Sequence, residues 1–122
     1  MRAAPARILL VDDKAERLLT YEAILGRLGQ VLVRARSGKE ALARLEESEF
    51  AAILLDVSMP GMDGFALAAE FARLPATQHA HVLAFSGLSQ LDEARVAAAG
   101  FAECLVKPVE PSRLLRTVRA HL

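Results

Sequence analysis

Hydrophobic and polar positions follow two alternating patterns along this chain. Five short runs are rich in Val, Ile and Leu: Ile8 to Val11, Val31 to Val33, Ala51 to Leu55, His81 to Phe85 and Cys104 to Val106. The segments between these runs repeat their apolar residues at helical spacing. Alternation of apolar strands with helices is typical of a parallel sheet that is covered on both faces. The pattern therefore predicts an α/β fold of five strands and five helices.

The first helical segment has one apolar face. Leu18, Tyr21, Leu25 and Leu28 follow one another at spacings of three, four and three residues, and residues at such spacings share a side of an α-helix. Gly29 comes next. A glycine directly after the last apolar residue is a common helix stop, so we expect the helix to end there.

Capping residues indicate where the other helices begin. Ser37 to Glu40 reads as a capping box, and a third helix follows Asp63 and Gly64. Ser89 is a candidate cap for a fourth helix that ends at Gly100, and Pro111 suits the first turn of a fifth. The expected apolar positions are Leu42 and Leu45 in the second helix, Phe65, Ala68 and Ala72 in the third, and Leu114, Leu115 and Val118 in the fifth.

Length and composition fit one small domain. The chain has 122 residues, enough to bury roughly 60–70% of the surface that the unfolded chain exposes. We expect residues 1–6 to be a loose arm and residues 7–122 to form the domain. Fifteen Lys plus Arg balance fifteen Asp plus Glu, so no long-range field favours a nucleic acid or an anionic membrane as partner.

Cysteine content and hydropathy predict a cytoplasmic location. Cys104 is the single cysteine, which rules out an internal disulfide. The first apolar run meets Asp12 after four residues, unlike the apolar stretch of a signal peptide. No apolar run approaches the roughly 20 residues that a transmembrane helix needs.

Polar residues stand directly after four of the five apolar runs. Asp12 and Asp13 follow the first run, Asp56 the third, Ser86 the fourth and Lys107 the fifth. In an open α/β sheet, ligands bind beyond the carboxyl ends of the strands. We therefore expect these side chains to meet at one edge of the sheet.

Their chemistry suits phosphoryl transfer. Three converging carboxylates repel one another unless a hard cation such as Mg2+ neutralises them, and a lysine across the same pocket can bind an anion. Taken singly, each feature has a plainer explanation: the Asp12-Asp13 pair fits a solvated turn, Ser86 a turn residue and Lys107 a surface charge. Only their joint position at the strand ends favours a site.

Four motifs carry a family resemblance: ILLVDD (Ile8 to Asp13), LLDVSMPGMDG (Leu54 to Gly64), FSG (Phe85 to Gly87) and LVKP (Leu105 to Pro108). From about Arg7 to its end, the chain resembles the receiver domain of two-component response regulators, of the chemotaxis-regulator-like type. The resemblance implies a flavodoxin-like (βα)5 fold, a doubly wound five-stranded parallel sheet with strand order 2-1-3-4-5.

The resemblance also implies an acceptor and a metal site. Asp56 corresponds to the carboxylate that accepts a phosphoryl group from a phosphohistidine. Asp13 and Asp56 would bind Mg2+ directly, Asp12 would assist through water, and the backbone carbonyl of Ser58 would complete the metal ligands.

Two further residues resemble the family's phosphoryl-binding groups. Lys107 corresponds to the lysine that holds the phosphoryl oxygens, and its bond to Pro108 is expected to be cis. Ser86 corresponds to the hydroxyl residue that turns inward toward the phosphoryl group. The implied protein is a signalling switch rather than a conventional enzyme; it promotes its own phosphorylation and slow dephosphorylation.

The implied partners are a histidine kinase or histidine phosphotransfer protein and a downstream protein. The downstream target would bind the face formed by the fourth helix, fifth strand and fifth helix, which could also support a homodimer. Both a single-domain regulator and a receiver from a hybrid sensor kinase fit the sequence.

Some positions depart from the family pattern or remain outside it. Cys104 stands where the family usually has Tyr or Phe, and we expect a small core thiol there rather than a redox sensor. Lys14 is a hypothetical modulator of Mg2+ binding. His79 and His81 lack a neighbouring Cys or carboxylate pattern, so no metal role is expected for them, and His121 is expected to be solvated. Arg113, Arg116 and Arg119 form a basic stripe that fits a solvated face or a docking site for an acidic partner.

Three other functions fit the sequence less well. A pseudo-receiver, which keeps the fold as an interaction module without phosphorylation, is the main alternative, although every pocket position holds a competent residue. An aspartyl-phosphate phosphatase commonly has a DxD pattern, which Asp56-Val57-Ser58 lacks. A nucleotide- or flavin-binding domain would need a glycine-rich loop where Asp12-Asp13-Lys14 stands.

Overall fold

The structure is a computed structural model that describes residues 5–59, 63–87 and 93–122. Strands and helices alternate through these residues as β1 (Arg7–Val11), α1 (Ala15–Leu25), β2 (Val31–Ala35), α2 (Gly38–Glu47), β3 (Ala52–Asp56), α3 (Gly64–Ala72), β4 (His81–Ser86), α4 (Glu93–Ala98), β5 (Glu103–Val106) and α5 (Pro111–Ala120). Two short 3-10 turns, η1 (Gly26–Leu28) and η2 (Pro75–Thr77), follow α1 and α3. The alternation expected from the apolar runs is confirmed.

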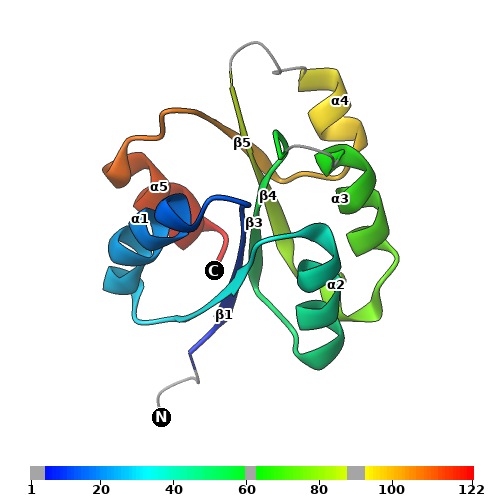
Figure 1. Cartoon of the computed structure of the whole chain (residues 1–122), viewed down its shortest axis with the longest axis horizontal. Coiled ribbons are helices and arrows are strands. Elements are labelled where there is room, and N and C mark those ends of the chain that lie inside the picture. Colours follow the sequence, from blue (N-terminus) through cyan, green and yellow to red (C-terminus); the bar gives the residue numbers. More distant parts are fainter. Residues whose placement is uncertain (1–4, 60–62, 88–92) are drawn as a thin grey trace.

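The five strands form one parallel sheet with the order β2-β1-β3-β4-β5. Helices α1 and α5 cover one face, and α2, α3 and α4 cover the other (Figure 1). This is the doubly wound arrangement that the sequence predicted. Strand order reverses next to β1, so the carboxyl ends of β1 and β3 border the crevice where such sheets bind ligands.

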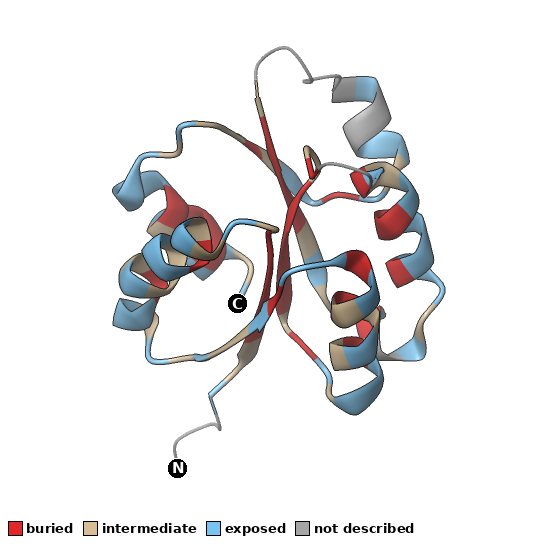
Figure 2. Ribbon diagram, viewed as in Figure 1, coloured by how far each residue is buried: buried red, intermediate tan, exposed pale blue. Residues whose placement is uncertain are grey.

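The core lies in two layers, one on each side of the sheet. In β1, Ile8 and Leu10 pack toward α1 and α5, whereas Leu9 and Val11 pack toward α2 and α3. All five residues of β3 are buried, and Figure 2 shows the inner strands as the most continuously buried part of the chain. Full burial of one such aliphatic side chain contributes roughly 1.5–3 kcal/mol to the free energy of unfolding. Burial of β1 and β3 therefore stabilises the positions of their carboxyl ends.

Most of the predicted helix boundaries are confirmed. The Ser37 side chain accepts a hydrogen bond from the Glu40 amide at 3.1 Å and so caps α2. Asp63 caps α3 in the same way, and Pro111 occupies the first turn of α5. Gly29 has a positive φ of 68° and ends the 3-10 turn η1, whereas α1 itself ends at Leu25, earlier than predicted. The predicted cap Ser89 lies outside the described residues.

The inward face of α3 differs from the expected one. Leu67, Ala68 and Phe71 are buried, whereas Phe65 is half-buried and Ala72 is exposed. The placement of Ala72 in the apolar face was therefore wrong. Leu67 and Phe71, four residues apart, lie at the centre of the buried face. Ala72 follows Phe71 directly and so points away from that face toward solvent.

Gly64 begins α3 at a point where the helix approaches the end of β3. A Cβ atom added to Gly64 would lie 2.5 Å from the Cα of Val57, a separation at which one of the two backbones would have to move. Glycine is therefore required here by close approach rather than by its φ angle. This contact fixes α3 beside the residue that follows Asp56.

Candidate functional site

Three carboxylates meet at the carboxyl ends of β1 and β3. Asp12 and Asp13 follow β1, and Asp56 is the last residue of β3. One oxygen of each carboxylate lies within 4.8 Å of the others, which is close enough for all three to face one cation. Asp12 and Asp56 are buried, while Asp13 is half-buried. The structure thus brings together the three aspartates that the sequence placed at one sheet edge.

Both oxygens of Asp56 have partners. Its Oδ1 accepts a hydrogen bond from the Ser58 amide at 2.9 Å and lies 2.9 Å from Nζ of Lys107. Its Oδ2 accepts a hydrogen bond from Nη1 of Arg17 at 3.1 Å. The residue is only 1% exposed, so these contacts hold a buried carboxylate in one orientation.

The carboxylate of Asp12 has fewer hydrogen-bond partners than that of Asp56. Its Oδ1 accepts a hydrogen bond from the Lys14 amide at 3.0 Å and lies 3.7 Å from Nη1 of Arg17. Its Oδ2 is buried without a hydrogen-bond partner among the described residues. Burial raises the pKa of Asp12 above its ordinary value, and Asp56 raises it further; the Lys14 amide, Arg17 and Lys107 lower it.

The unpartnered oxygen is a test of whether a metal would fit. A buried carboxylate oxygen without a donor is costly, and a cation beside it would offset that cost. The three carboxylates of Asp12, Asp13 and Asp56 offer only oxygen ligands, the ligand type that Mg2+ prefers. The residues present therefore fit a hard divalent cation.

Lys107 and Ser86 are placed by the pairing of β4 with β5. Ser86 is paired with Val106, and the amide of Lys107 donates a hydrogen bond to the Ser86 carbonyl at 2.9 Å. The Ser86 hydroxyl is buried and donates to the carbonyl of Gly87 at 3.0 Å. The Lys107-Pro108 bond is cis, as the family resemblance implied.

Arg17 is the charged residue that sequence analysis missed. The sequence drew attention to Lys14, but that residue is exposed and reaches the pocket with its backbone amide. Arg17, in the first turn of α1, reaches the pocket with its guanidinium. No local pattern pointed to it, because Arg17 contacts Asp56, 39 residues away in sequence, and Asp12, which lies before the helix begins.

Tyr21 lies one further turn along α1 and senses the same charges. Its ring stacks on Phe85, with centroids 4.8 Å apart and planes inclined by 4°. The pKa of Tyr21 is raised to about 12, mainly by burial and then by the negative charges of Asp12 and Asp56. Arg17 acts in the opposite direction.

Comparison with known proteins assigns this arrangement to a family. A family model described as the response regulator receiver domain matches residues 8–119. The chain belongs to the response regulator receiver family. Receiver domains act as signalling switches rather than as classical enzymes.

Relatives of this receiver occur both within large proteins and alone. The virulence sensor protein BvgS of Bordetella bronchiseptica is 38% identical over 109 residues, which make up 84% of this chain but only 9% of that protein. Protein PilH of Pseudomonas aeruginosa is 29% identical over 96% of this chain and 98% of its own length. The chain thus spans less than a tenth of the BvgS protein and nearly all of PilH.

Solved structures support the same assignment. The chemotaxis response regulator CheY4 of Vibrio cholerae superimposes with a TM-score of 0.89 at 28% identity, covering 98% of this chain and 100% of that one. None of the helices in the described part of the receiver combines the length and hydrophobicity that crossing a bilayer requires.

Cys104 occupies the position where receivers usually have an aromatic residue. It is half-buried and packs against the core layer on the α2 and α3 side of the sheet. Burial raises the pKa of its thiol, and Arg113 partly opposes that shift. A raised pKa disfavours the reactive thiolate, which supports a packing role over redox sensing.

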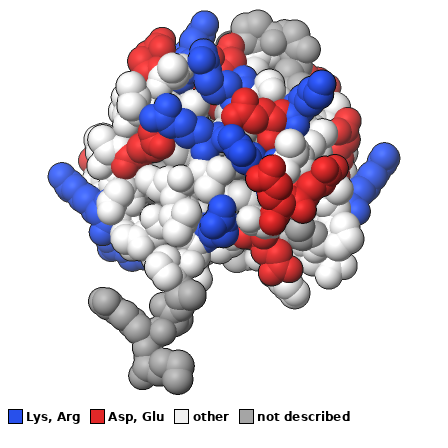
Figure 3. All heavy atoms as spheres, turned by 60° about the horizontal axis from the view of Figure 1, so that its bottom comes forward, with Lys and Arg blue, Asp and Glu red and all other residues white. Residues whose placement is uncertain are grey.

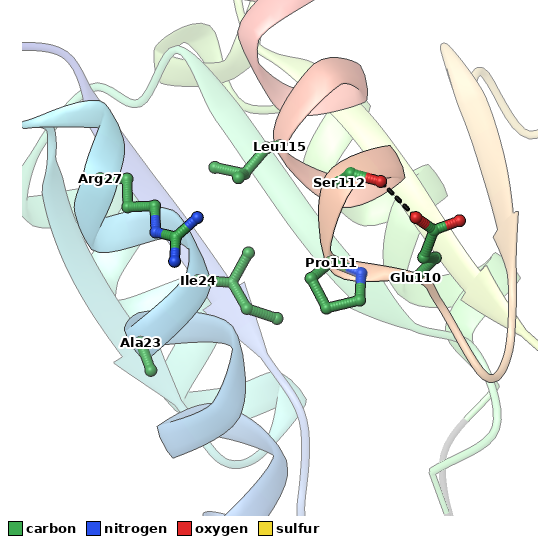
Figure 4. A pocket seen from close by; sticks show the side chains of 7 residues that line it. All are labelled: Ala23, Ile24, Arg27, Glu110, Pro111, Ser112 and Leu115. Atoms are coloured by element: carbon green, nitrogen blue, oxygen red, sulfur yellow. Dashed lines mark hydrogen bonds between the residues drawn. The ribbon is translucent and has the colours of Figure 1, made fainter.

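A surface pocket lies apart from the acidic site. It has a volume of about 530 Å³ and lies between α1 and the start of α5 (Figure 4). Its walls consist of Ala23, Ile24, Arg27, Glu110, Pro111, Ser112 and Leu115. None of the three aspartates lines it, so it is separate from the acidic site. Figure 3 shows acidic and basic side chains close together on the face that it draws, in keeping with the net charge of zero.

Proposed function

We propose that this receiver accepts a phosphoryl group from a phosphohistidine onto Asp56 in an Mg2+-dependent reaction. The observation that carries the proposal is the position of Asp56. Its carboxylate ends a fully buried strand, contacts Lys107 at 2.9 Å and lies within 4.8 Å of two further carboxylates. A nucleophile, an anion-binding lysine and a cation site are thus combined in one pocket.

Four residues would hold the metal ion. Asp13 and Asp56 would bind Mg2+ directly, Asp12 would assist through water, and the backbone carbonyl of Ser58 would complete the protein ligands. Bound Mg2+ would neutralise the carboxylates and the charge that develops on the phosphoryl oxygens. The Ser58 amide already donates to Asp56, which keeps this backbone segment beside the acceptor.

The transfer requires an oxygen of Asp56 to attack the phosphorus atom. A new O–P bond forms as the N–P bond of the phosphohistidine breaks, and the histidine nitrogen keeps the electron pair. Lys107 is placed to stabilise negative charge on the transferred oxygens. Arg17, which now contacts Oδ2 of Asp56, would have to release that oxygen or follow the phosphoryl group.

Phosphorylation would switch a protein-binding surface. The new phosphoryl oxygens would accept a hydrogen bond from the Ser86 hydroxyl in place of its present bond to Gly87. Such a change would bias a pre-existing equilibrium between two loop conformations. The surface formed by α4, β5 and α5 would then bind a downstream protein or a second receiver.

The donor would be a histidine kinase or a histidine phosphotransfer protein. The resemblance to part of BvgS fits a receiver within a sensor protein, and the resemblance to the whole of PilH fits a separate regulator. Both arrangements present the same chemistry to Asp56, so the proposal is the same for either.

One observation favours the pseudo-receiver as an alternative. Arg17 forms ion pairs with both Asp56 and Asp12, so an internal cation already neutralises part of the pocket. In that case the fold would serve as an interaction module that is never phosphorylated.

Intact-mass spectrometry after incubation with acetyl phosphate and Mg2+ separates the two functions. The proposal predicts a gain of one phosphoryl group that is absent from Asp56→Asn and from an EDTA control. An unchanged mass in the wild-type protein, with no detectable Mg2+ binding, would support the pseudo-receiver.

A further inference from the structure

Two histidines and a glutamate meet at the end of the sheet opposite the acidic site. His81 begins β4 and Glu103 begins β5, while His121 follows the last residue of α5. His121 lies 40 residues after His81 and 18 residues after Glu103 in the sequence, so no local motif indicates this cluster. About 16 Å of strand separates His81 from Ser86 at the acidic end of β4.

The strand register explains why these side chains converge. Glu103 is paired with Leu83, and His81 lies two residues before Leu83 on the same strand. Side chains two residues apart in a strand point to the same face. Leu83 packs with Leu114 and Val118 of α5. His81 and Glu103 therefore lie on the face that α5 covers, next to where that helix ends.

The distances within this cluster are short and directional. Nδ1 of His121 lies 3.2 Å from Nδ1 of His81, and the two rings are inclined by 75°. Nδ1 of His81 also lies 3.1 Å from the backbone oxygen of His121. On the other side of the His121 ring, Nε2 lies 3.2 Å from Oε2 of Glu103.

Glu103 determines which nitrogen of His121 can bind a cation. A carboxylate accepts a hydrogen bond, so Nε2 of His121 carries the proton and Nδ1 keeps its lone pair when the ring is neutral. Donation of the second ring N–H to a carboxylate is the usual way in which proteins orient a metal-binding histidine. Glu103 is thus a positioning residue for Nδ1 of His121.

We propose that His81 and His121 form a binding site for a divalent transition metal ion of the Zn2+ type. Imidazole nitrogens suit Zn2+, Cu2+ and Ni2+. Two nitrogens bound to a tetrahedral Zn2+ at about 2.0–2.1 Å lie about 3.3 Å apart, close to the 3.2 Å observed between the two Nδ1 atoms. The His121 carbonyl is a further oxygen donor.

The surroundings leave room for the rest of the coordination shell. His81 is exposed, and the side chain of Glu103 is 46% exposed, so water can reach the open positions of a bound ion. Without metal, one Nδ1 must carry a proton and donate it to the other nitrogen or to the carbonyl. Metal binding would replace that proton. The ion would then tie the end of α5 to the start of β4.

Calorimetric titration of tag-free protein with Zn2+ tests this site. Excess Mg2+ in the buffer and an Asp13→Asn background disable the acidic pocket as a competing site. The expected result is one Zn2+ per chain, with affinity at least tenfold weaker in His81→Gln and in His121→Gln. Glu103→Gln should weaken binding by about tenfold or more, as loss of a positioning carboxylate usually does.

His79→Gln is the matched control. His79 is an exposed histidine two residues before His81, and its removal should leave Zn2+ affinity unchanged. The unfolding midpoint without metal should be the same in all four variants. The paramagnetic resonance spectrum of bound Cu2+ should show coupling to two imidazole nitrogens. Absence of Zn2+ binding, or equal affinity in His81→Gln and the starting protein, would overturn the proposal.

Discussion

Nη1 of Arg17 lies 3.1 Å from Oδ2 of Asp56, so a helix residue neutralises the proposed phosphoacceptor before any metal is bound. The same nitrogen is 3.7 Å from Asp12. The Arg17 side chain is 42% exposed, whereas the Asp56 side chain is 1% exposed. A partly exposed cation therefore pairs with a buried carboxylate, and Mg2+ and Arg17 would compete for the same negative charge.

Arg17→Ala is expected to tighten Mg2+ binding. Loss of a competing cation at a partly exposed ion pair corresponds to about 1 kcal/mol, or roughly fivefold in affinity. Tyr21 is the only tyrosine in a chain without tryptophan, so its fluorescence can follow the titration. Lys14→Ala is the matched control, because the Lys14 side chain is exposed. A similar gain in both variants would indicate a long-range charge effect instead of direct competition.

Asp12→Asn is expected to stabilise the metal-free protein. The buried Oδ2 has no hydrogen-bond donor to compensate its negative charge, and Asn removes that charge. The expected gain is about 1 kcal/mol, or several degrees in the unfolding midpoint. Because the pKa of Asp12 is raised in the folded state from its ordinary 3.8, the penalty grows as pH rises through the interval above 3.8. The advantage of the variant should therefore increase as pH rises above 3.8 and vanish below it. Calorimetric unfolding without Mg2+ would show this, and a lower midpoint at pH 7 would contradict it.

The ionisation of Tyr21 should report the charge of the pocket. Its pKa of about 12 reflects burial and then the nearby negative charges, so Asp56→Asn should lower it toward the ordinary value near 10. Ultraviolet absorbance during alkaline titration measures this directly. Since the folded pKa exceeds the unfolded one, the unfolding free energy should fall from about pH 10 to about pH 12. An identical titration curve in Asp56→Asn would show that Tyr21 does not sense Asp56.

Gly64→Ala should destabilise the receiver. The added Cβ would lie 2.5 Å from the Cα of Val57, and overpacking of this kind costs about 1–3 kcal/mol or more. Gly26→Ala is the matched control, because Gly26 has a helical φ of −54° and open space around it. That substitution should be neutral or stabilising by up to about 1 kcal/mol. Denaturant unfolding of the two variants would compare them, and equal stabilities would refute the close contact.

The sheet and its aspartates could be predicted because they depend on local pattern. Apolar runs fixed the strands, and the residues directly after them had to lie at the carboxyl edge once the strands were parallel. Arg17 could not be assigned in the same way. Its contact with Asp56 depends on the path of the turn before α1 and on the side-chain conformation of a long residue.

Features that depend on tertiary register were also hidden. His121 was expected to be solvated, yet it is half-buried against His81 and near Glu103. That contact requires the pairing of β4 with β5 and the docking of α5, neither of which a local window contains. Ala72 was misplaced for a related reason, since α3 is rotated by the packing of its larger neighbours Leu67 and Phe71.

Asp56 itself is the proposed phosphoacceptor, and reductive trapping can locate the phosphorylated residue. Protein treated with acetyl phosphate and Mg2+ is reduced with borohydride, which converts an aspartyl phosphate to homoserine, and the modified residue is then located by tandem mass spectrometry. Homoserine is expected at position 56 only, and none is expected when Mg2+ is removed. Homoserine at Asp12 or Asp13, or an unmodified chain in the presence of Mg2+, would contradict it.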